Sequence, residues 1–322
     1  MPGGRQRWYA RPVVATRLAQ AAAVMVVLNI VSGGSVRLSG SGLGCPDWPT
    51  CSKRSITPAL SLHPMIEFGN RMVVVLLVIV AGAALLAVLA RRPYRGDLAW
   101  LASGLVAGIF AEAGVGAAVV YSHLNPYVVA GHFFLGIVLL ANATVLALRS
   151  SHAPGRGVPK VARRELRLAA MTLAVLACAM AAGSAATGAG PHAGGPGAKR
   201  IPVPFEDLVR THSIVVIVAG AMLLVLLAAL YRADAPVDVQ DRGRILLVVM
   251  AAQGVLGYTQ YFLHVPAVLV GFHILGAALV TVIAIWFVAS MLYHQPADTE
   301  GSRPGAPEEY VASARHLDRV GA

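Results

Sequence analysis

Long apolar runs alternate with short polar breaks along most of this chain. A helix that crosses a bilayer needs about 20 apolar residues, and eight of the runs are long enough. We expect the helices at residues 14–36, 66–90, 97–121, 127–148, 167–187, 207–231, 244–263 and 267–294. The pattern therefore predicts an all-α integral membrane protein with eight transmembrane helices.

One part of the pattern occurs twice. Residues 112–132 (EAGVGAAVVYSHLNPYVVAGH) and 253–273 (QGVLGYTQYFLHVPAVLVGFH) each run from a polar residue, through a Gly-containing apolar segment and a break with proline, to a histidine. Such internal similarity is typical of membrane proteins built from two related halves. We therefore expect two pseudo-symmetric four-helix bundles, formed by residues 14–148 and 167–294.

Composition supports the membrane assignment. Hydrophobic residues make up 57% of the chain and charged residues only 13%, which is more apolar surface than a soluble domain can bury. The first apolar run is too long for a signal peptide and lacks a clear cleavage site, so we interpret it as the first helix.

The basic residues predict an orientation. Of the 26 Lys and Arg residues, 19 lie near the N-terminus, in three polar breaks or in the tail, and such clusters mark the cytoplasmic side. Both termini should then be cytoplasmic: an N-terminus of residues 1–13, a linker of residues 149–166 and a disordered tail of residues 295–322. The net charge of +11 accordingly indicates membrane topology, in a cell membrane, and not nucleic-acid binding.

The first outer loop, residues 37–65, contains a cysteine pair. Cys45 and Cys51 bracket the segment CPDWPTC on the oxidising side of the membrane, so we expect a disulfide. It could be a plain staple or a redox-active pair, and the spacing does not choose between them. Cys178 lies inside the fifth run and is interpreted as a small buried apolar residue.

Polar residues recur at one depth near the outer ends of the even-numbered helices. His132, His212 and His273 should each lie about 10 Å inside the membrane, and Asn70 occupies the matching region of the second helix. A single such histidine could be a satisfied core residue, but intramembrane ionisable groups usually mark function. Two facing imidazoles can ligate haem iron, which suits His212 with His273, whereas His132 would face Asn70.

Two carboxylates accompany this layer. Glu67 lies one turn from Asn70, either as an acid/base group beside a substrate or as an interfacial carboxylate paired with Arg71. Glu112 lies deeper in the third helix, where the second copy of the repeat has Gln253. It could pair across the bundle or be protonated.

Several motifs together resemble a known family, haem A synthase. They are GGSVRLSGSGLGCPDWPTC, EFGNR, LNPYVVAGH, TGAGPHAGG, RTH and QGVLGYTQYF followed by PAVLVGFH, and they span about residues 14–294. The cysteine pair resembles the bacterial branch with a redox-active first loop.

The resemblance implies oxidation of the C8 methyl of haem O to a formyl group, giving haem A for cytochrome oxidase. It further implies that His212 and His273 ligate a resident haem b, that His132 binds the substrate haem iron beside Asn70 and Arg71, that Glu67 is the essential carboxylate, and that Cys45 and Cys51 form the loop disulfide. The family often has histidine at the position of Asn70, so the substrate iron here lacks one strong ligand. Expected partners are haem O, a haem O synthase, an electron donor, membrane lipid and further copies of the chain.

Two other functions fit parts of the pattern. A membrane b-type cytochrome that only passes electrons would explain the histidine pair but neither Glu67 nor the cysteine loop. A secondary transporter would place charges at mid-depth, whereas this polar layer lies near the outer surface.

Overall fold

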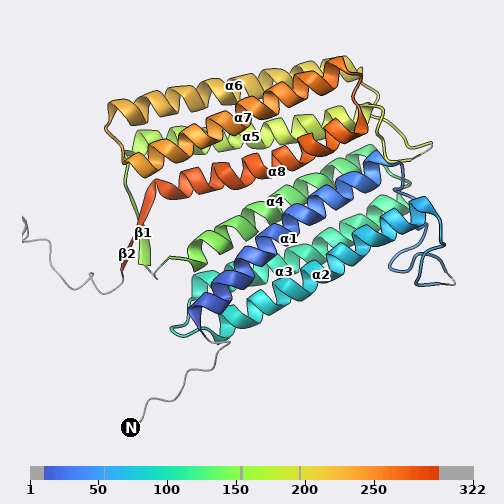
Figure 1. Ribbon diagram of the computed structural model, residues 1–322, viewed down its shortest axis with the longest axis horizontal. Coiled ribbons are helices and arrows are strands. Elements are labelled where there is room, and N and C mark those ends of the chain that lie inside the picture. The colour runs from blue at the N-terminus through green and yellow to red at the C-terminus, as the bar shows by residue number, and fades with distance from the viewer. Residues whose placement is uncertain (1–10, 54, 153–154, 196, 297–322) are drawn as a thin grey trace, which may run out of the picture.

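The computed structural model describes residues 11–53, 55–152, 155–195 and 197–296, and within them eight long helices are present (Figure 1). Their bounds are α1 (Pro12–Leu38), α2 (Leu62–Ala90), α3 (Gly96–Tyr121), α4 (Pro126–Ser150), α5 (Arg163–Ala189), α6 (Phe205–Arg232), α7 (Val237–Phe262) and α8 (Ala267–Ser290). All eight are long and apolar enough to cross a membrane, which confirms the predicted fold class.

The short outer turns show the internal repeat in the backbone. His123 and Leu124, between α3 and α4, have φ values of 51° and 60°, and His264 and Val265, between α7 and α8, have 62° and 60°. Paired left-handed conformations are unusual for residues other than glycine. The same strained turn at matching positions indicates that the two segments are copies of one design.

The helix contacts divide the molecule into two groups, α1–α4 and α5–α8. In the first group, α1 and α3 each pack against α2 and α4. In the second group, α6 packs against α5 and α7, and α7 packs against α8. Figure 1 shows α1–α4 on one side of the molecule and α5–α8 on the other. Grouping them as two pseudo-symmetric bundles stays a prediction that these contacts support.

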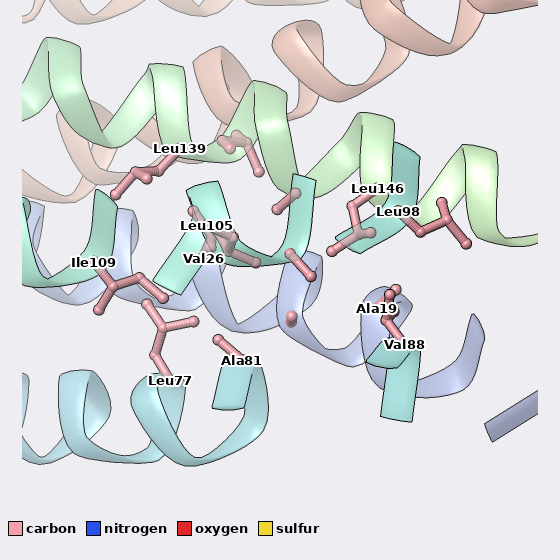
Figure 2. Packing of buried hydrophobic residues seen from close by; sticks show 14 of the residues in the cluster. Ala19, Val26, Leu77, Ala81, Val88, Leu98, Leu105, Ile109, Leu139 and Leu146 are labelled. Atoms are coloured by element: carbon pink, nitrogen blue, oxygen red, sulfur yellow. The ribbon is translucent and has the colours of Figure 1, made fainter. Parts of the chain in front are cut away.

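Each group of helices has its own buried cluster. The first includes Val26, Leu77, Leu105 and Leu139, whose side chains interdigitate between α1, α2, α3 and α4 (Figure 2). The second contains leucines of α6 together with Phe287 of α8. Small residues line the closest approaches, as expected where helices pack without a hydrophobic driving force.

Helices α1 and α4 join the two groups by packing against α8, and α4 also packs against α5. Gly34 of α1 lies so close to α8 that a Cβ there would come within 2.8 Å of the Ile274 side chain. The junction therefore lies next to the N-terminal part of α8, which carries His273.

The outward faces of the helices are apolar. On α2, for example, Val75, Leu76, Ile79 and Leu86 are all exposed. Contiguous exposed apolar surface of this kind suits contact with lipid and would be a liability in water. Cys178 lies on this surface too, so the expectation that it is buried is wrong.

The structure adds a two-stranded pairing that the pattern did not predict. Strand β1 (Gly155–Pro159), in the expected linker, pairs antiparallel with β2 (Leu292–Pro296), directly after α8. The last helix thus ends at Ser290 instead of continuing to residue 294. Of the expected disordered tail, residues 295 and 296 belong to β2, and residues 297–322, like residues 1–10 of the N-terminus, lie outside the described part.

Candidate functional site

The two histidines of the second group of helices face each other. His212 of α6 and His273 of α8 have ring centroids 6.3 Å apart. The Nδ1 atom of His212 lies 2.9 Å from the backbone oxygen of Ala179 on α5, so a proton on Nδ1 would be donated there. That tautomer leaves Nε2 of His212 free to act as a ligand.

The separation of the rings suits two axial ligands of one iron atom. A metal–imidazole bond is about 2 Å long and the ring centre lies about 1 Å beyond the nitrogen, so two such ligands place their ring centres about 6 Å apart. Both histidines are half-buried, and Nδ1 of His273 has no hydrogen-bond partner among the described residues. The pair therefore fits a haem held between α6 and α8.

A glycine lies beside each of the four predicted positions, and the two glycines of the second group of helices make room for a histidine ring. A Cβ on Gly183 would lie 3.0 Å from Cε1 of His212, and one on Gly257 would lie 3.2 Å from Cε1 of His273. In the first group of helices, Gly116 takes the corresponding place beside His132, at 3.5 Å, and Gly33 lies beside Asn70, at 3.9 Å. Gly183 and Gly257 thus provide notches for His212 and His273, whereas Gly116 and Gly33 lie at ordinary contact distance from His132 and Asn70.

In the first group of helices the polar side chains do not form a facing pair like His212 and His273. The Asn70 side-chain oxygen accepts a hydrogen bond of 2.7 Å from the Ser32 hydroxyl of α1. His132 of α4 instead meets Glu112 of α3, with Nδ1 and Oε1 3.2 Å apart. Glu112 therefore lies within ion-pair distance of His132 across the bundle.

Glu67 and Arg71 hold the first outer loop against α2. Glu67 is 5% exposed; its Oε2 accepts a 2.8 Å hydrogen bond from the Cys45 amide, and its Oε1 pairs with Arg71 at 2.7 Å. The Arg71 guanidinium also donates to four backbone oxygens of the loop, those of Cys45, Asp47, Pro49 and Thr50. Both oxygens of Glu67 are thus occupied, as in the paired-carboxylate interpretation.

The expected disulfide joins Cys45 to Cys51, with an S–S distance of 2.01 Å. Gly44 packs directly on the start of α2, where a Cβ would come within 2.5 Å of the His63 backbone oxygen. The loop, its disulfide and the Glu67–Arg71 pair therefore form one unit at the outer end of α2.

A second cluster, which the pattern did not predict, joins the two groups of helices at the end of the molecule that carries the disulfide loop. Arg37, at the end of α1, donates a 2.8 Å hydrogen bond to the backbone oxygen of His192, whose Nε2 lies 2.8 Å from the backbone oxygen of Val265. Gly42 donates from its amide to the Gly194 oxygen. Only the run of glycines around His192 hinted at such close backbone contacts.

Among the residues that the structure describes, no three His, Cys, Asp or Glu side chains gather into a metal cage. A porphyrin supplies the equatorial ligands of its iron, so it needs only one or two protein ligands. The residues present fit a haem at His212 and His273, and a more open site at His132.

Eight apolar helices with imidazoles set in glycine notches define a polytopic membrane protein with polar sites inside its helix groups. The COX15-CtaA family model, described as a cytochrome oxidase assembly protein, matches residues 16–63 and 58–194, more than half of the chain. The chain belongs to this family. The matched part contains Cys45, Glu67 and His132; His212 and His273 follow it.

Curated relatives agree with this assignment. A protein named Heme A synthase from Geobacillus kaustophilus (strain HTA426) is 33% identical over 133 residues, covering 39% of this chain and 40% of the relative. One from Geobacillus thermodenitrificans is 32% identical over 151 residues, 44% and 46% of the two chains, and one from Symbiobacterium thermophilum is 31% identical over 125 residues, 38% and 40%. The chain thus matches less than half of the length of each of these relatives.

Proposed function

We propose that this protein is a haem A synthase, which oxidises the C8 methyl group of haem O to a formyl group. The observation that carries the proposal is the asymmetry between its two histidine sites. One site has two facing imidazoles, which suit permanent haem binding, and the other has a single imidazole, which suits a haem that must enter and leave. Family membership and the names of the relatives support the same activity.

The resident cofactor in this proposal is a haem b ligated by His212 and His273. Bound there, it would supply one-electron transfer. The protein contributes the ring orientation, through the contact of His212 with the Ala179 oxygen, and the space, through Gly183 and Gly257.

We place substrate haem O in the first group of helices, with its iron on His132. Asn70 on the opposite helix is a poor iron ligand, so one face of the substrate would stay open. Haem O carries a long apolar tail and should enter sideways from the bilayer, and the apolar outer faces of the helices suit that route.

Glu67 is proposed as the carboxylate that conversion requires, with Arg71 beside the substrate. Both carboxylate oxygens are hydrogen-bonded in this structure, to Cys45 and Arg71, so acid/base work by Glu67 would require one of these bonds to exchange. The carboxylate thereby links the disulfide loop to the proposed substrate region.

The distribution of basic residues supports a cell-membrane location with both termini in the cytoplasm. A haem O synthase that delivers the insoluble substrate, and an electron donor, are the partners this activity requires. Assembly into oligomers is compatible with the apolar outer faces.

Pigment analysis tests the proposal. Cells that make haem O but no haem A should accumulate haem A when they express this chain, and extracted haems would be separated and identified by mass. The variant His132→Ala should abolish haem A and keep the resident haem spectrum. A haem-loaded, reducible protein that never yields haem A would instead identify a membrane b-type cytochrome that passes electrons without modifying haem.

A further inference from the structure

Glu112 is a buried carboxylate that the proposed reaction does not yet use. It is 9% exposed, its Oε2 has no hydrogen-bond partner among the described residues, and its Oε1 lies 3.2 Å from Nδ1 of His132. Ionisable groups inside membrane helices are costly, so an intramembrane carboxylate facing a histidine is a candidate functional group.

A notch on α4 holds the Glu112 carboxylate beside the histidine. Gly136 lies one turn after His132, and a Cβ there would come within 3.3 Å of Oε1 of Glu112 and within 3.7 Å of Ile30. The Glu112 carboxylate thus packs against the backbone of α4 at Gly136, next to the apolar side chain of Ile30, and His132 is its polar neighbour. Among the described residues Nδ1 of His132 has no hydrogen-bond partner, and the Oε1 atom of Glu112 lies within ion-pair distance of it.

The second copy of the repeat has a similar arrangement with a neutral amide in place of the carboxyl group. Gln253 occupies the position of Glu112, and a glycine of α8, Gly276, makes room for it. Its amide donates a 2.7 Å hydrogen bond to the backbone oxygen of His273, and the ring Nδ1 of His273 receives no partner. The three histidines therefore differ at Nδ1: His132 faces a carboxylate, His212 a backbone oxygen and His273 neither.

We infer that Glu112 is a positioning residue. It orients His132 through Nδ1 and makes Nε2 of His132 a more basic iron ligand than Nε2 of the other two histidines. A carboxylate at the remote nitrogen of a metal-ligating imidazole fixes the tautomer and raises the basicity of the ligand. A strong single ligand on one side compensates for the missing histidine at Asn70. The inference rests on the proposed function, because it requires iron at His132.

The test uses the full-length protein with its resident haem, purified in detergent and titrated with ferric haem b as the probe. Binding that is lost in His132→Ala defines the His132 site. In the reduced protein, resonance Raman spectroscopy measures the iron–histidine stretch of this site, and a redox titration measures its midpoint potential. A side chain with a merely structural role would move neither quantity while haem stays bound.

Glu112→Gln keeps the side-chain shape and reproduces the residue of the second copy. We expect a lower iron–histidine stretching frequency, a higher midpoint potential and about 10–100-fold weaker binding of the added haem. The matched control Glu206→Gln removes an exposed carboxylate from the outer end of α6 and should leave all three unchanged. Glu112→Asp, which keeps a carboxyl group, should restore the frequency and potential toward the parent values.

Unchanged frequency and potential in haem-loaded Glu112→Gln would overturn the inference and leave the proposed function standing. A parent protein without any His132-dependent haem would overturn the substrate site itself, and the inference with it. Should Glu112→Gln fail to fold, shown by loss of the resident haem spectrum, Glu112→Ala decides: an iron–histidine stretching frequency and a midpoint potential equal to those of the parent protein would overturn the inference.

Discussion

Arg71 divides its guanidinium between one carboxylate and four backbone oxygens of the first outer loop. An arginine can do this because its planar fork presents five donors, whereas a lysine ammonium is a compact point charge. The residue thus holds the path of the whole CPDWPTC segment, in addition to neutralising Glu67.

Arg71→Lys should therefore keep the charge pair and still loosen the loop. We expect a loss of about 2–3 kcal/mol of stability, from several hydrogen bonds to a charged group, and faster reduction of the Cys45–Cys51 disulfide. Thermal unfolding in detergent and the rate of thiol release under dithiothreitol would measure the two effects. The control Arg210→Lys, at an exposed arginine of α6, should change neither, and a parent-like reduction rate in Arg71→Lys would refute the role.

At the scale of residues, the sequence predicted which side chains pair, but not the other groups that contact each pair. The Glu67–Arg71 pair follows from i,i+4 spacing, and the disulfide follows from a short stiff span on the side that is predicted to be oxidising. The loop oxygens on Arg71 depend on the path of the loop, which local spacing does not encode. Cys178 was assigned to the core wrongly, because a small apolar residue in a membrane helix can equally well face lipid.

At the scale of helices, close approach is set by glycine. The notches at Gly183 and Gly257 place α5 and α7 against His212 and His273. Glycine costs about 0.5–1 kcal/mol relative to alanine inside a helix, so a notch is maintained against helix propensity.

Gly183→Ala tests the tightest notch. Its Cβ would lie 3.0 Å from Cε1 and 3.2 Å from Nδ1 of His212, so the ring must move and its contact with the Ala179 oxygen must weaken. We expect about tenfold lower occupancy of the resident haem, measured from the haem-to-protein absorbance ratio after purification. Gly220→Ala on α6, where a Cβ meets nothing within 4 Å, should keep full occupancy; an equal loss in both variants would point to a general effect on the helices.

The notches also show why helix existence was easier to predict than helix contacts. Eight apolar runs define eight helices whatever their neighbours, and the observed bounds extend the expected ones by a few residues at most ends. Which glycine faces which histidine depends on how each helix is rotated about its axis, and apolar residues on all sides of a membrane helix leave that rotation undetermined.

Two buried arginines lie at the end of the first group of helices that is opposite to the disulfide loop. Arg91 and Arg95 donate to the last backbone oxygens of α4, at Ser150 and Arg149, where the helix leaves carbonyl groups without partners. Burial lowers the pKa of the Arg91 guanidinium, and the nearby charge of Arg95 lowers it further. Two of the basic residues from which the orientation is predicted thus also cap a helix.

For the whole molecule, the basic residues predict one orientation. A green fluorescent protein fused after Ala322 should fluoresce, because it folds only in the cytoplasm, and alkaline phosphatase inserted after Ala198 should be active, because it folds only outside. The reverse pattern in both fusions would invert the topology and place the disulfide loop on the cytoplasmic side.

The exposed position of Cys178 offers a probe that needs no substitution. The chain has three cysteines and two form the disulfide, so an oxidised sample presents one thiol, on α5 directly before the residue whose oxygen holds His212. A nitroxide attached there would lie close enough to a ferric resident haem for the iron to speed its relaxation. Magnetic resonance on the unmutated protein can then follow haem loading. If the disulfide is reduced, Cys45 and Cys51 also take up a nitroxide, so two additional labels report that the first outer loop has lost its crosslink.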